Sequence, residues 1–253
     1  MVLKKMLEFK RKSNQQVLIS NLVEGDFMSS LKGKKILITS GGTLEKWDNV
    51  RGHTNLAKGT IGCYLAEEAL NKEAEIIYLH GYFAKLPENR RKMRLIQFEG
   101  IYDLGEKIKN IVQSENIDIV IMAAAGSDWV VDKVLDQRGN PILESGKMSS
   151  DEPPIIHFKK APKVLSQIKK WNPNLLLVGF KLEHTDDLNY LLDRANLRMT
   201  ASNAEFMVAN KTGSLYGEEA EHYIVSKFQA PKKYSSKNET AAGLIHLLEN
   251  YIN

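Results

Sequence analysis

The residues best suited to chemistry in this sequence lie between Ser40 and Gly62, where two glycine pairs flank a polar segment. Gly41 and Gly42 follow a strand-like apolar run, and Gly59 precedes an expected helix. A strand, a glycine turn and a helix start together present backbone N–H groups to phosphate. Neither a G-x-x-x-x-G-K-[ST] loop nor a compact G-x-G-x-x-G turn is present. A polar connection of this length predicts a phosphate or anhydride site.

Two polar side chains inside the segment suit an anionic ligand. Arg51 offers a guanidinium, which binds carboxylate or phosphate through two parallel hydrogen bonds. Asn55 offers a carboxamide close to the expected helix start. A glycine-dependent crossover with a solvated polar loop is the alternative, and the sequence leaves it open.

Asp128 offers a carboxylate at the expected end of another strand. It follows the small residues Ala123, Ala124, Ala125 and Gly126 at the expected carboxyl end of a strand, where a flat ligand can approach the backbone. A capping role, which is an ordinary use of aspartate, is the alternative.

The remaining candidate groups are cations. Lys160 and Lys163 lie at an expected helix start, where an anion would offset their repulsion by the helix dipole. Arg194 and Arg198 lie one turn apart on another expected helix, and Lys147 lies in a loop. Cations and amides stabilise developing negative charge rather than transfer protons. Solvated surface positions are the alternative for each of them.

Composition excludes several other functions. The single cysteine, Cys63, leaves no disulfide framework and no cysteine-based zinc site. The spacing of His53, His157 and His184 is not that of metal ligands. A net charge of +4 without a basic stripe does not favour nucleic acid, and the apolar runs are shorter than the roughly twenty residues of a membrane span. We therefore expect a cytoplasmic protein that binds small anionic molecules.

The elements that must position these groups are strands and helices that alternate along the chain. Strands that are apolar on both faces and separated by helices predict an α/β fold, with a Rossmann-like, mostly parallel sheet between two helical layers. Ligands then bind beyond the carboxyl ends of the strands, in the loops at 40–59, after 80 and at 124–129. The expected strands are 35–39, 74–80, 94–98, 117–125, 175–182 and 206–209. The expected helices are 60–71, 102–114, 162–170, 186–199 and 237–251.

Three further regions complete the expected organisation. Residues 133–154, with Ile142 and Leu143, predict short antiparallel strands in a projecting hairpin. A second hairpin is expected at 213–227. Residues 1–33, with a basic run at 10–12, form an N-terminal extension before a domain at 34–253.

Taken together, these motifs resemble the phosphopantothenate–cysteine ligase (phosphopantothenoylcysteine synthetase) family. The resemblance covers residues 34–253 and rests on the ordered set rather than on one motif. Its members are Ile38–Thr43, Val50-Arg51, Asn55, Gly59, Gly62, Ala123–Ala125 with Asp128-Trp129, Lys147–Ser150, Ala161–Lys163, Val178–Glu183 and Val208–Asn210. The flavin decarboxylase domain of the bacterial fusion form has no counterpart here, so FMN is not expected.

The resemblance implies a two-step ligation in coenzyme A synthesis. 4′-Phosphopantothenate and CTP or ATP, with Mg²⁺, give an acyl-nucleotidylate and pyrophosphate; the cysteine amine then displaces the nucleoside monophosphate. Asn55 would hold the acyl-nucleotidylate, Arg51 would bind phosphopantothenate, and Lys147 would stabilise charge on the α-phosphate. Further substrate contacts are implied for Gly41, Gly42, Gly59 and Asn210. Nucleotide contacts are implied for Ala123, Ala124, Asp128, Lys147, Lys160, Ala161, Pro162, Lys163, Phe180, Arg194 and Arg198.

The resemblance also implies a homodimer, with residues 133–154 as the antiparallel dimerisation region. Ala161-Pro162-Lys163 replaces the Asn-Pro-Asp of the bacterial fusion form, which leaves CTP and ATP open. Two other functions are considered. A Rossmann-type NAD(P)-dependent reductase is disfavoured by the missing compact glycine motif and by His80, where an acidic ribose ligand is expected. The other is a non-catalytic nucleotide-binding module.

Overall fold

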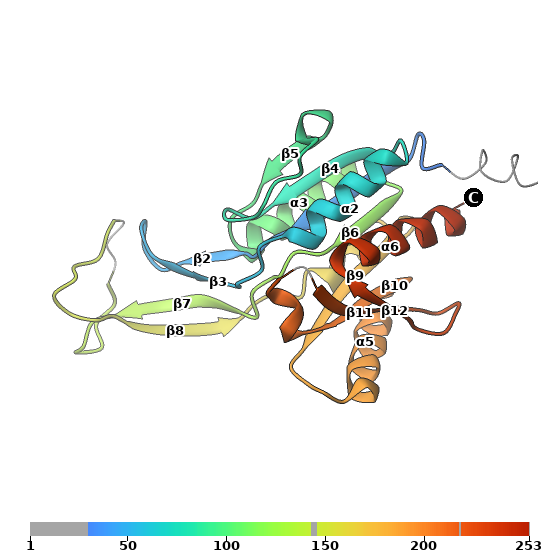
Figure 1. The fold of residues 1–253 in the computed structure, drawn as a ribbon. Helices are drawn as coiled ribbons and strands as arrows, with labels where there is room; N and C mark the ends of the chain where they lie inside the picture. Colours follow the sequence, from blue (N-terminus) through green and yellow to red (C-terminus); the bar gives the residue numbers. More distant parts are fainter. Residues whose placement is uncertain (1–29, 143–145, 218, 253) are drawn as a thin grey trace, which may run out of the picture.

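The computed structural model describes residues 30–142, 146–217 and 219–252. They form an eight-stranded sheet covered by helices, from which a two-stranded arm projects (Figure 1). The strands of the sheet are β1 (Lys35–Ser40), β4 (Glu75–His80), β5 (Arg94–Gln97), β6 (Ile119–Met122), β9 (Leu176–Glu183), β10 (Phe206–Lys211), β11 (Glu219–Ser226) and β12 (Lys232–Ser236). The helices are α2 (Thr60–Asn71), α3 (Ile101–Ser114), α4 (Leu165–Trp171), α5 (Leu188–Ser202) and α6 (Lys237–Ile252), with 3₁₀ turns η1 (Arg90–Lys92) and η2 (Thr212–Leu215).

The order of strands places a reversal of direction beside β1. The order is β12-β11-β10-β9-β6-β1-β4-β5. The strands from β10 to β5 are parallel, and β11 and β12 add an antiparallel edge. The chain runs outward from β1 to β4 and β5, and then returns to the other side of β1 at β6. The carboxyl ends of β1 and β6 therefore form the crevice where such sheets bind ligands.

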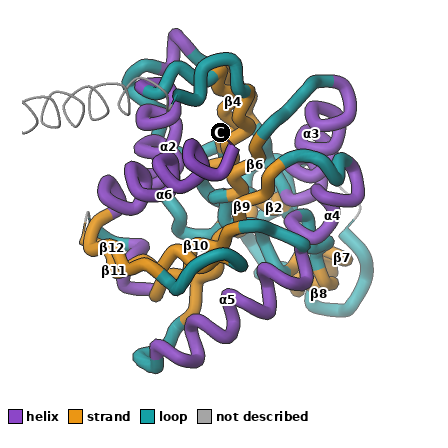
Figure 2. The backbone as a smooth tube through the Cα atoms, turned by 90° about the vertical axis from the view of Figure 1, so that its right-hand side faces the viewer, coloured by secondary structure: helices purple, strands orange, loops and turns teal. Residues whose placement is uncertain are grey.

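The central strands are buried because both faces of the sheet are covered. Helices α2 and α6 lie on one face, and α3, α4 and α5 lie on the other (Figure 2). Leu37 and Val120 point toward the α3 side, whereas Ile36 and Ile121 point toward the α2 side. Strands without polar alternation are explained by this two-sided burial, and the predicted α/β class is confirmed.

Two elements of the structure differ from their prediction, one in where it begins and one in how its strands pair. The helix expected from Pro162 begins at Leu165. The hairpin expected at 213–227 is wrong, because residues 212–215 form a 3₁₀ turn and β11 pairs instead with β10 and β12. Apolar alternation predicts a strand but does not identify its partners.

The polar segment after β1 is a short hairpin rather than a long loop. Strands β2 (Leu44–Lys46) and β3 (Gly52–Thr54) pair antiparallel. The buried Glu45 carboxylate accepts a hydrogen bond from the backbone N–H of Ile101 at 2.9 Å. This bond supplies a partner for an amide at the start of α3, so the hairpin and the helix are positioned together.

The projecting arm consists of β7 (Trp129–Leu135) and β8 (Ile155–Lys160), which pair antiparallel. Antiparallel pairing was expected here, although the strands flank the 136–154 segment rather than lie within it. Leu143 lies outside the described residues. The arm leaves the body beside the β2–β3 hairpin (Figure 1).

The expected N-terminal extension falls largely outside the described residues, which begin at Ser30. Leu31 is fully buried, and its N–H donates to the Lys72 carbonyl at 2.9 Å. Residues just before β1 thus pack on the end of α2. No helix in the described ranges has the length and apolar character needed to cross a membrane.

Candidate functional site

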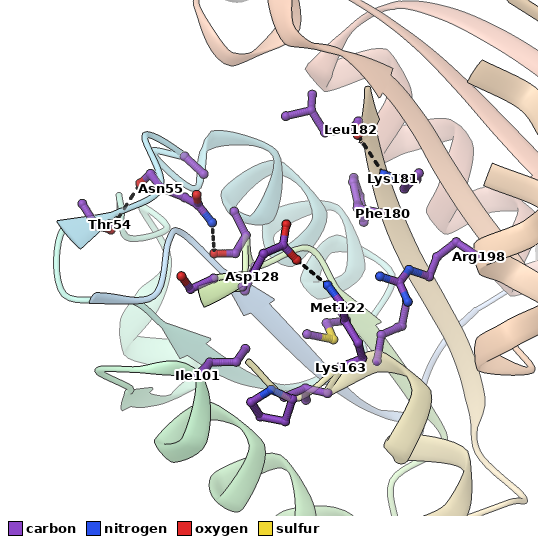
Figure 3. Close-up of a pocket in the computed structure, with 18 of the residues that line it drawn as sticks. Thr54, Asn55, Ile101, Met122, Asp128, Lys163, Phe180, Lys181, Leu182 and Arg198 are labelled. Atoms are coloured by element: carbon purple, nitrogen blue, oxygen red, sulfur yellow. Dashed lines mark hydrogen bonds and ion pairs between the residues drawn. The ribbon is translucent and has the colours of Figure 1, made fainter. Parts of the chain in front are cut away.

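A cavity of about 480 Å³ opens beyond the carboxyl ends of β1 and β6 (Figure 3). It lies at the predicted switch point, and its size falls within the usual range for small-molecule sites. We call it the large cavity. Its lining includes Thr54, Asn55, Met122, Ala124, Asp128, Pro162, Lys163, Phe180, Lys181 and Arg198.

Asn55 is positioned by the loop that follows β6. Its side-chain amide donates to the carbonyl of Ala125 at 2.9 Å (Figure 3). The backbones of these loops are themselves joined, because Ala125 N–H donates to the Gly41 carbonyl at 2.8 Å and Thr43 N–H donates to the Ala125 carbonyl at 3.2 Å. Two segments far apart in sequence therefore hold Asn55 at the edge of the large cavity.

Asp128 and Lys163 form an ion pair across the large cavity (Figure 3). Lys163 therefore already has an anionic partner, and the carboxylate of Asp128 acts as that partner rather than as a helix cap. Arg198 also lines this cavity, with no ion pair among the described residues. With Lys181, which also lines it, the large cavity offers an incoming polyphosphate two paired cations and one, Arg198, without an ion pair among the described residues.

Arg194 is engaged elsewhere. Its Nε lies 3.1 Å from Glu183, which also pairs with Lys181 at 2.7 Å. Burial opposes ionisation of Glu183, but the hydrogen bonds from Lys181 and Arg194 hold the pKa of this carboxyl below its ordinary value. Arg194 lines neither of the two cavities described here, whereas Lys181, which sequence reasoning did not assign a role, lines the large one.

A second cavity of about 150 Å³, the small cavity, adjoins the first. Both share lining residues Ala57, Ala124, Ala125, Phe180, Leu182 and Leu215. The small cavity also contacts the expected site residues Gly59, Ala123 and Asn210. It adds Ser214, His222 and Lys237, which sequence reasoning missed because their approach depends on the pairing of β11 and the docking of α6.

Gly41 and Gly42 allow neighbouring loops to pack closely against each other. A Cβ on Gly41 would lie 2.5 Å from Cβ of Ala84, and one on Gly42 would lie 2.6 Å from the Asn55 carbonyl. Neither glycine lines either cavity. The loop after β4 therefore packs directly on the turn after β1.

Arg51 lies at the tip of the β2–β3 hairpin and contacts the segment between β7 and β8, which contains Lys147. Its Nε is 3.0 Å from Asp48, and its guanidinium donates to the Met148 carbonyl. Asp48 also accepts hydrogen bonds from the N–H groups of Val50, Arg51 and Met148. These bonds, with the charge of Arg51, outweigh burial and hold the pKa of Asp48 below its ordinary value.

Four further predicted residues lie outside both cavities of this chain. Arg51 and Lys147 lie by the arm, Lys160 is exposed at the end of β8, and Ala161 is buried. None of them lines either cavity.

Cys63 is buried in α2, and burial raises the pKa of its thiol. No group of three or more His, Cys, Asp or Glu side chains within the described residues could hold a metal ion.

The fold and the two adjoining cavities define a Rossmann-like α/β protein with a crevice lined by basic side chains at the switch point of its sheet. Residues 31–251 match the family model described as the DNA/pantothenate metabolism flavoprotein C-terminal domain, and the chain belongs to this family. The family resemblance seen in the sequence is thereby confirmed.

Similar proteins agree with this assignment. The coenzyme A biosynthesis bifunctional protein CoaBC of Thermococcus kodakarensis is 29% identical over 80% of this chain and 47% of its own length. The protein of the same name from Methanocaldococcus jannaschii is 27% identical over 87% and 52%, respectively. The chain thus spans about half the length of these relatives.

A solved structure shows the same fold. The DNA/pantothenate metabolism flavoprotein of Streptococcus pneumoniae matches with a TM-score of 0.77 and 27% identity. The match covers 87% of this chain and all of that chain.

Proposed function

We propose that this chain is a phosphopantothenate–cysteine ligase of coenzyme A synthesis. The observation that carries the proposal is the pair of adjoining cavities at the switch point, with Asn55 held at the edge of the large one. Membership of the family supports it, and its relatives are named for coenzyme A biosynthesis.

The large cavity suits the nucleoside triphosphate. Phe180 and the small residues around Ala124 offer flat, apolar contact to base and ribose. Lys163 and Arg198 face the same space and would neutralise the phosphates. The carboxylate of phosphopantothenate attacks the α-phosphorus, an acyl–O–P bond forms, and the bond to pyrophosphate breaks.

Asn55 lies where the acyl-nucleotidylate would form. Hydrogen bonds from a preorganised amide stabilise such an intermediate without the cost of reorienting solvent. The amine of cysteine then attacks the acyl carbon, the C–O bond to the nucleotide breaks, and the ammonium loses a proton as the amide forms. Either CTP or ATP satisfies this chemistry.

Mg²⁺ fits the proposal as an ion that accompanies the nucleotide. The large cavity offers it one carboxylate, Asp128, and Mg²⁺ is commonly held by one or two carboxylates together with substrate phosphates. When bound, it would neutralise charge on the phosphates.

A homodimer is part of the same proposal. Trp129, Ile155 and Phe158 are exposed on the arm, where a second copy could cover them. Arg51 and Lys147 line neither cavity of their own chain. Arg51, on the β2–β3 hairpin, contacts the segment between β7 and β8 that contains Lys147. A second copy that covers the arm would therefore receive both side chains near its own cavity. A cytoplasmic location, which suits a buried free thiol, completes the proposal.

The test is to incubate the purified protein with phosphopantothenate, cysteine, Mg²⁺ and either CTP or ATP, following pyrophosphate and the amide product. We expect pyrophosphate release to depend on phosphopantothenate, and amide formation to require cysteine as well. A protein that binds nucleotide but releases no pyrophosphate with either one would contradict the ligase assignment and favour a non-catalytic binding module.

A further inference from the structure

His53 joins two walls of the large cavity without lining it. The residue lies on β3, two positions before Asn55, which belongs to one wall. Ser127 and Asp128 belong to another wall, and Trp129 follows them at the start of β7. Nε2 of His53 lies 3.2 Å from the Trp129 carbonyl and 3.4 Å from Ser127 Oγ. One imidazole therefore connects segments that are far apart in the sequence and that meet at the same cavity.

The hydrogen-bond partners of the ring determine which nitrogen of His53 carries the hydrogen. A carbonyl oxygen can only accept, so Nε2 must donate to the Trp129 carbonyl. Ser127 Oγ gives its one hydrogen to the same carbonyl at 2.7 Å, so toward Nε2 it can only accept. In the neutral ring Nδ1 then carries a lone pair, and this atom is buried without a hydrogen bond to any described residue. The ring therefore holds the segment at 127–129 through Nε2–H alone.

Neighbouring aromatic rings fix the orientation of this imidazole. The ring of Phe158, on β8, meets it edge to face, with centroids 4.9 Å apart and planes at 87°. The ring of Trp47 lies on the hairpin with its centroid 6.3 Å away. These contacts hold the imidazole with Nε2–H toward the Trp129 carbonyl.

Asp128 is the residue whose position depends on this hydrogen bond. It lies between the two residues that the imidazole contacts, and its carboxylate pairs with Lys163 across the large cavity. Thr43 holds one side of this segment, because its Oγ1 accepts from the Ser127 N–H at 2.9 Å. The imidazole holds the other side at Trp129. A displacement there would move the carboxylate and the ammonium that is paired with it.

We propose that His53 is a positioning residue that places Asp128 and Lys163 for the nucleotide. The hydrogen bond from Nε2–H to the Trp129 carbonyl holds these two charges at the separation from Asn55 that a bound triphosphate requires. The proposal rests on the ligase function proposed above. His53 lines neither cavity, so it acts through the residues that it holds rather than on the reacting atoms.

A donor is all that this role requires, so the ring and its N–H can be tested separately. His53→Phe keeps an aromatic ring beside Phe158 and removes the donor. His53→Gln removes the ring and keeps an N–H near the position of Nε2. His246→Phe changes an exposed histidine of α6 outside both cavities and is the matched control. Ser127 still donates to the Trp129 carbonyl in His53→Phe, so its thermal midpoint should stay within a few degrees of the wild type.

The experiment is steady-state kinetics of the intact protein, following pyrophosphate and amide with whichever of CTP and ATP supports turnover. We expect His53→Phe to raise the KM for the nucleotide about tenfold, the effect of losing one hydrogen bond of ordinary strength. The kcat and the KM for cysteine should stay within about twofold, because Lys163 meets the phosphates in the ground state and the transition state alike.

The two other variants decide between a hydrogen bond and simple packing. His53→Gln and His246→Phe should keep the nucleotide KM of the wild type. An unchanged nucleotide KM in His53→Phe would overturn the proposal. A rise in His53→Gln as large as that in His53→Phe would also overturn it, because the effect would then belong to the ring.

Binding measurements separate this proposal from the proposed function. Turnover by every variant with equal nucleotide KM would overturn the role of His53 and leave the ligase assignment intact. If the wild type releases no pyrophosphate, the ligase assignment falls, and calorimetric titration with CTP and ATP then decides the role of His53. Binding about tenfold weaker in His53→Phe than in the wild type would support that role, and equal or absent binding would overturn it.

Discussion

Asn55 donates one amide hydrogen to the Ala125 carbonyl, and the side chain also lines the large cavity. This contact lies at the surface, so its loss should change stability by no more than about 1 kcal/mol. A role in the acyl-nucleotidylate step would instead appear in the rate.

We therefore expect Asn55→Ala to lower amide formation by about a hundredfold or more, the usual effect of removing one preorganised donor. The thermal midpoint should stay within a few degrees of the wild type. Asn174→Ala, an exposed asparagine outside both cavities, is the control and should keep full activity. Unchanged turnover in Asn55→Ala would remove this residue from the reaction.

Gly62 gives a prediction about stability at a single residue. Alanine in place of glycine within a helix usually stabilises a protein by about 0.5–1 kcal/mol. At Gly62 a Cβ would instead overlap the buried Ser40 hydroxyl, which donates to the Gly59 carbonyl at 3.0 Å.

Gly62→Ala should thus lower the free energy of unfolding by about 1–3 kcal/mol in denaturant titrations. Gly105→Ala is the matched helical control, because its nearest neighbour would be a side-chain methyl of Val164 at 3.3 Å. A Gly62→Ala variant as stable as the wild type would show that the end of β1 can move away from α2.

At the scale of elements, the predicted strands and helices largely match those of the structure, because the sequence patterns that indicate them are local. The strand at β1 and the helix at α2 follow from continuous apolar burial and helical spacing, and α2 has the predicted bounds. The start of α4 was placed too early because Pro162 favours a first helical turn, yet Ala161 still donates to the Asp128 carbonyl.

Site residues were predictable where they lie in motifs and not where they depend on tertiary pairing. Asn55 and Asp128 come from loops that the parallel-sheet rule already indicates, whereas Phe180, which lies inside β9, is indicated only by the family resemblance. His222 lies on a strand whose partners alternation could not identify, and it reaches the small cavity only because β11 pairs with β10.

The arm leads to a prediction that distinguishes sites within one chain from sites shared between chains. If Arg51 serves the partner's cavity, a heterodimer of Arg51→Ala and Asn55→Ala subunits contains one intact site and one with both defects. Random mixing of two inactive variants should then restore about a quarter of wild-type activity, since half of the dimers are mixed.

The measurement is amide formation after the two variants are unfolded and refolded together. Each variant refolded alone is the control and should remain inactive. Activity no greater than that of the separate variants would place Arg51 and Asn55 in the same chain's site.

At the scale of the whole molecule, two groups with large pKa shifts, His222 and Glu221, contribute to the acid dependence of stability at different pH. His222 has a pKa of about 4 in the folded protein and an ordinary value near 6.5 when unfolded. The unfolded state then binds more protons between these values, so stability falls as pH drops from 6.5 to 4. The total loss is about 3 kcal/mol.

Hydrogen bonds from Lys233 and Tyr223 lower the pKa of Glu221 to about 2, against an ordinary 4.5. The stability from this group is present above pH 4.5 and is lost as pH falls toward 2. Denaturant titrations from pH 7 to 3 should therefore show two successive decreases for the wild type and only the second for His222→Gln. His184→Gln, which changes an exposed histidine outside both cavities, should retain both. A first decrease that persists in His222→Gln would assign it to another group.

The walls of the small cavity come from residues near Ala57, from the loop after β6 and from Lys237 at the start of α6. Segments this distant in sequence meet only after long loops have closed, which slows folding. A molecule bound between these segments links them non-covalently. If the ligase substrates fill both cavities, amide hydrogens of β11 and α6 should exchange more slowly in their presence, because the antiparallel edge can no longer open without releasing them.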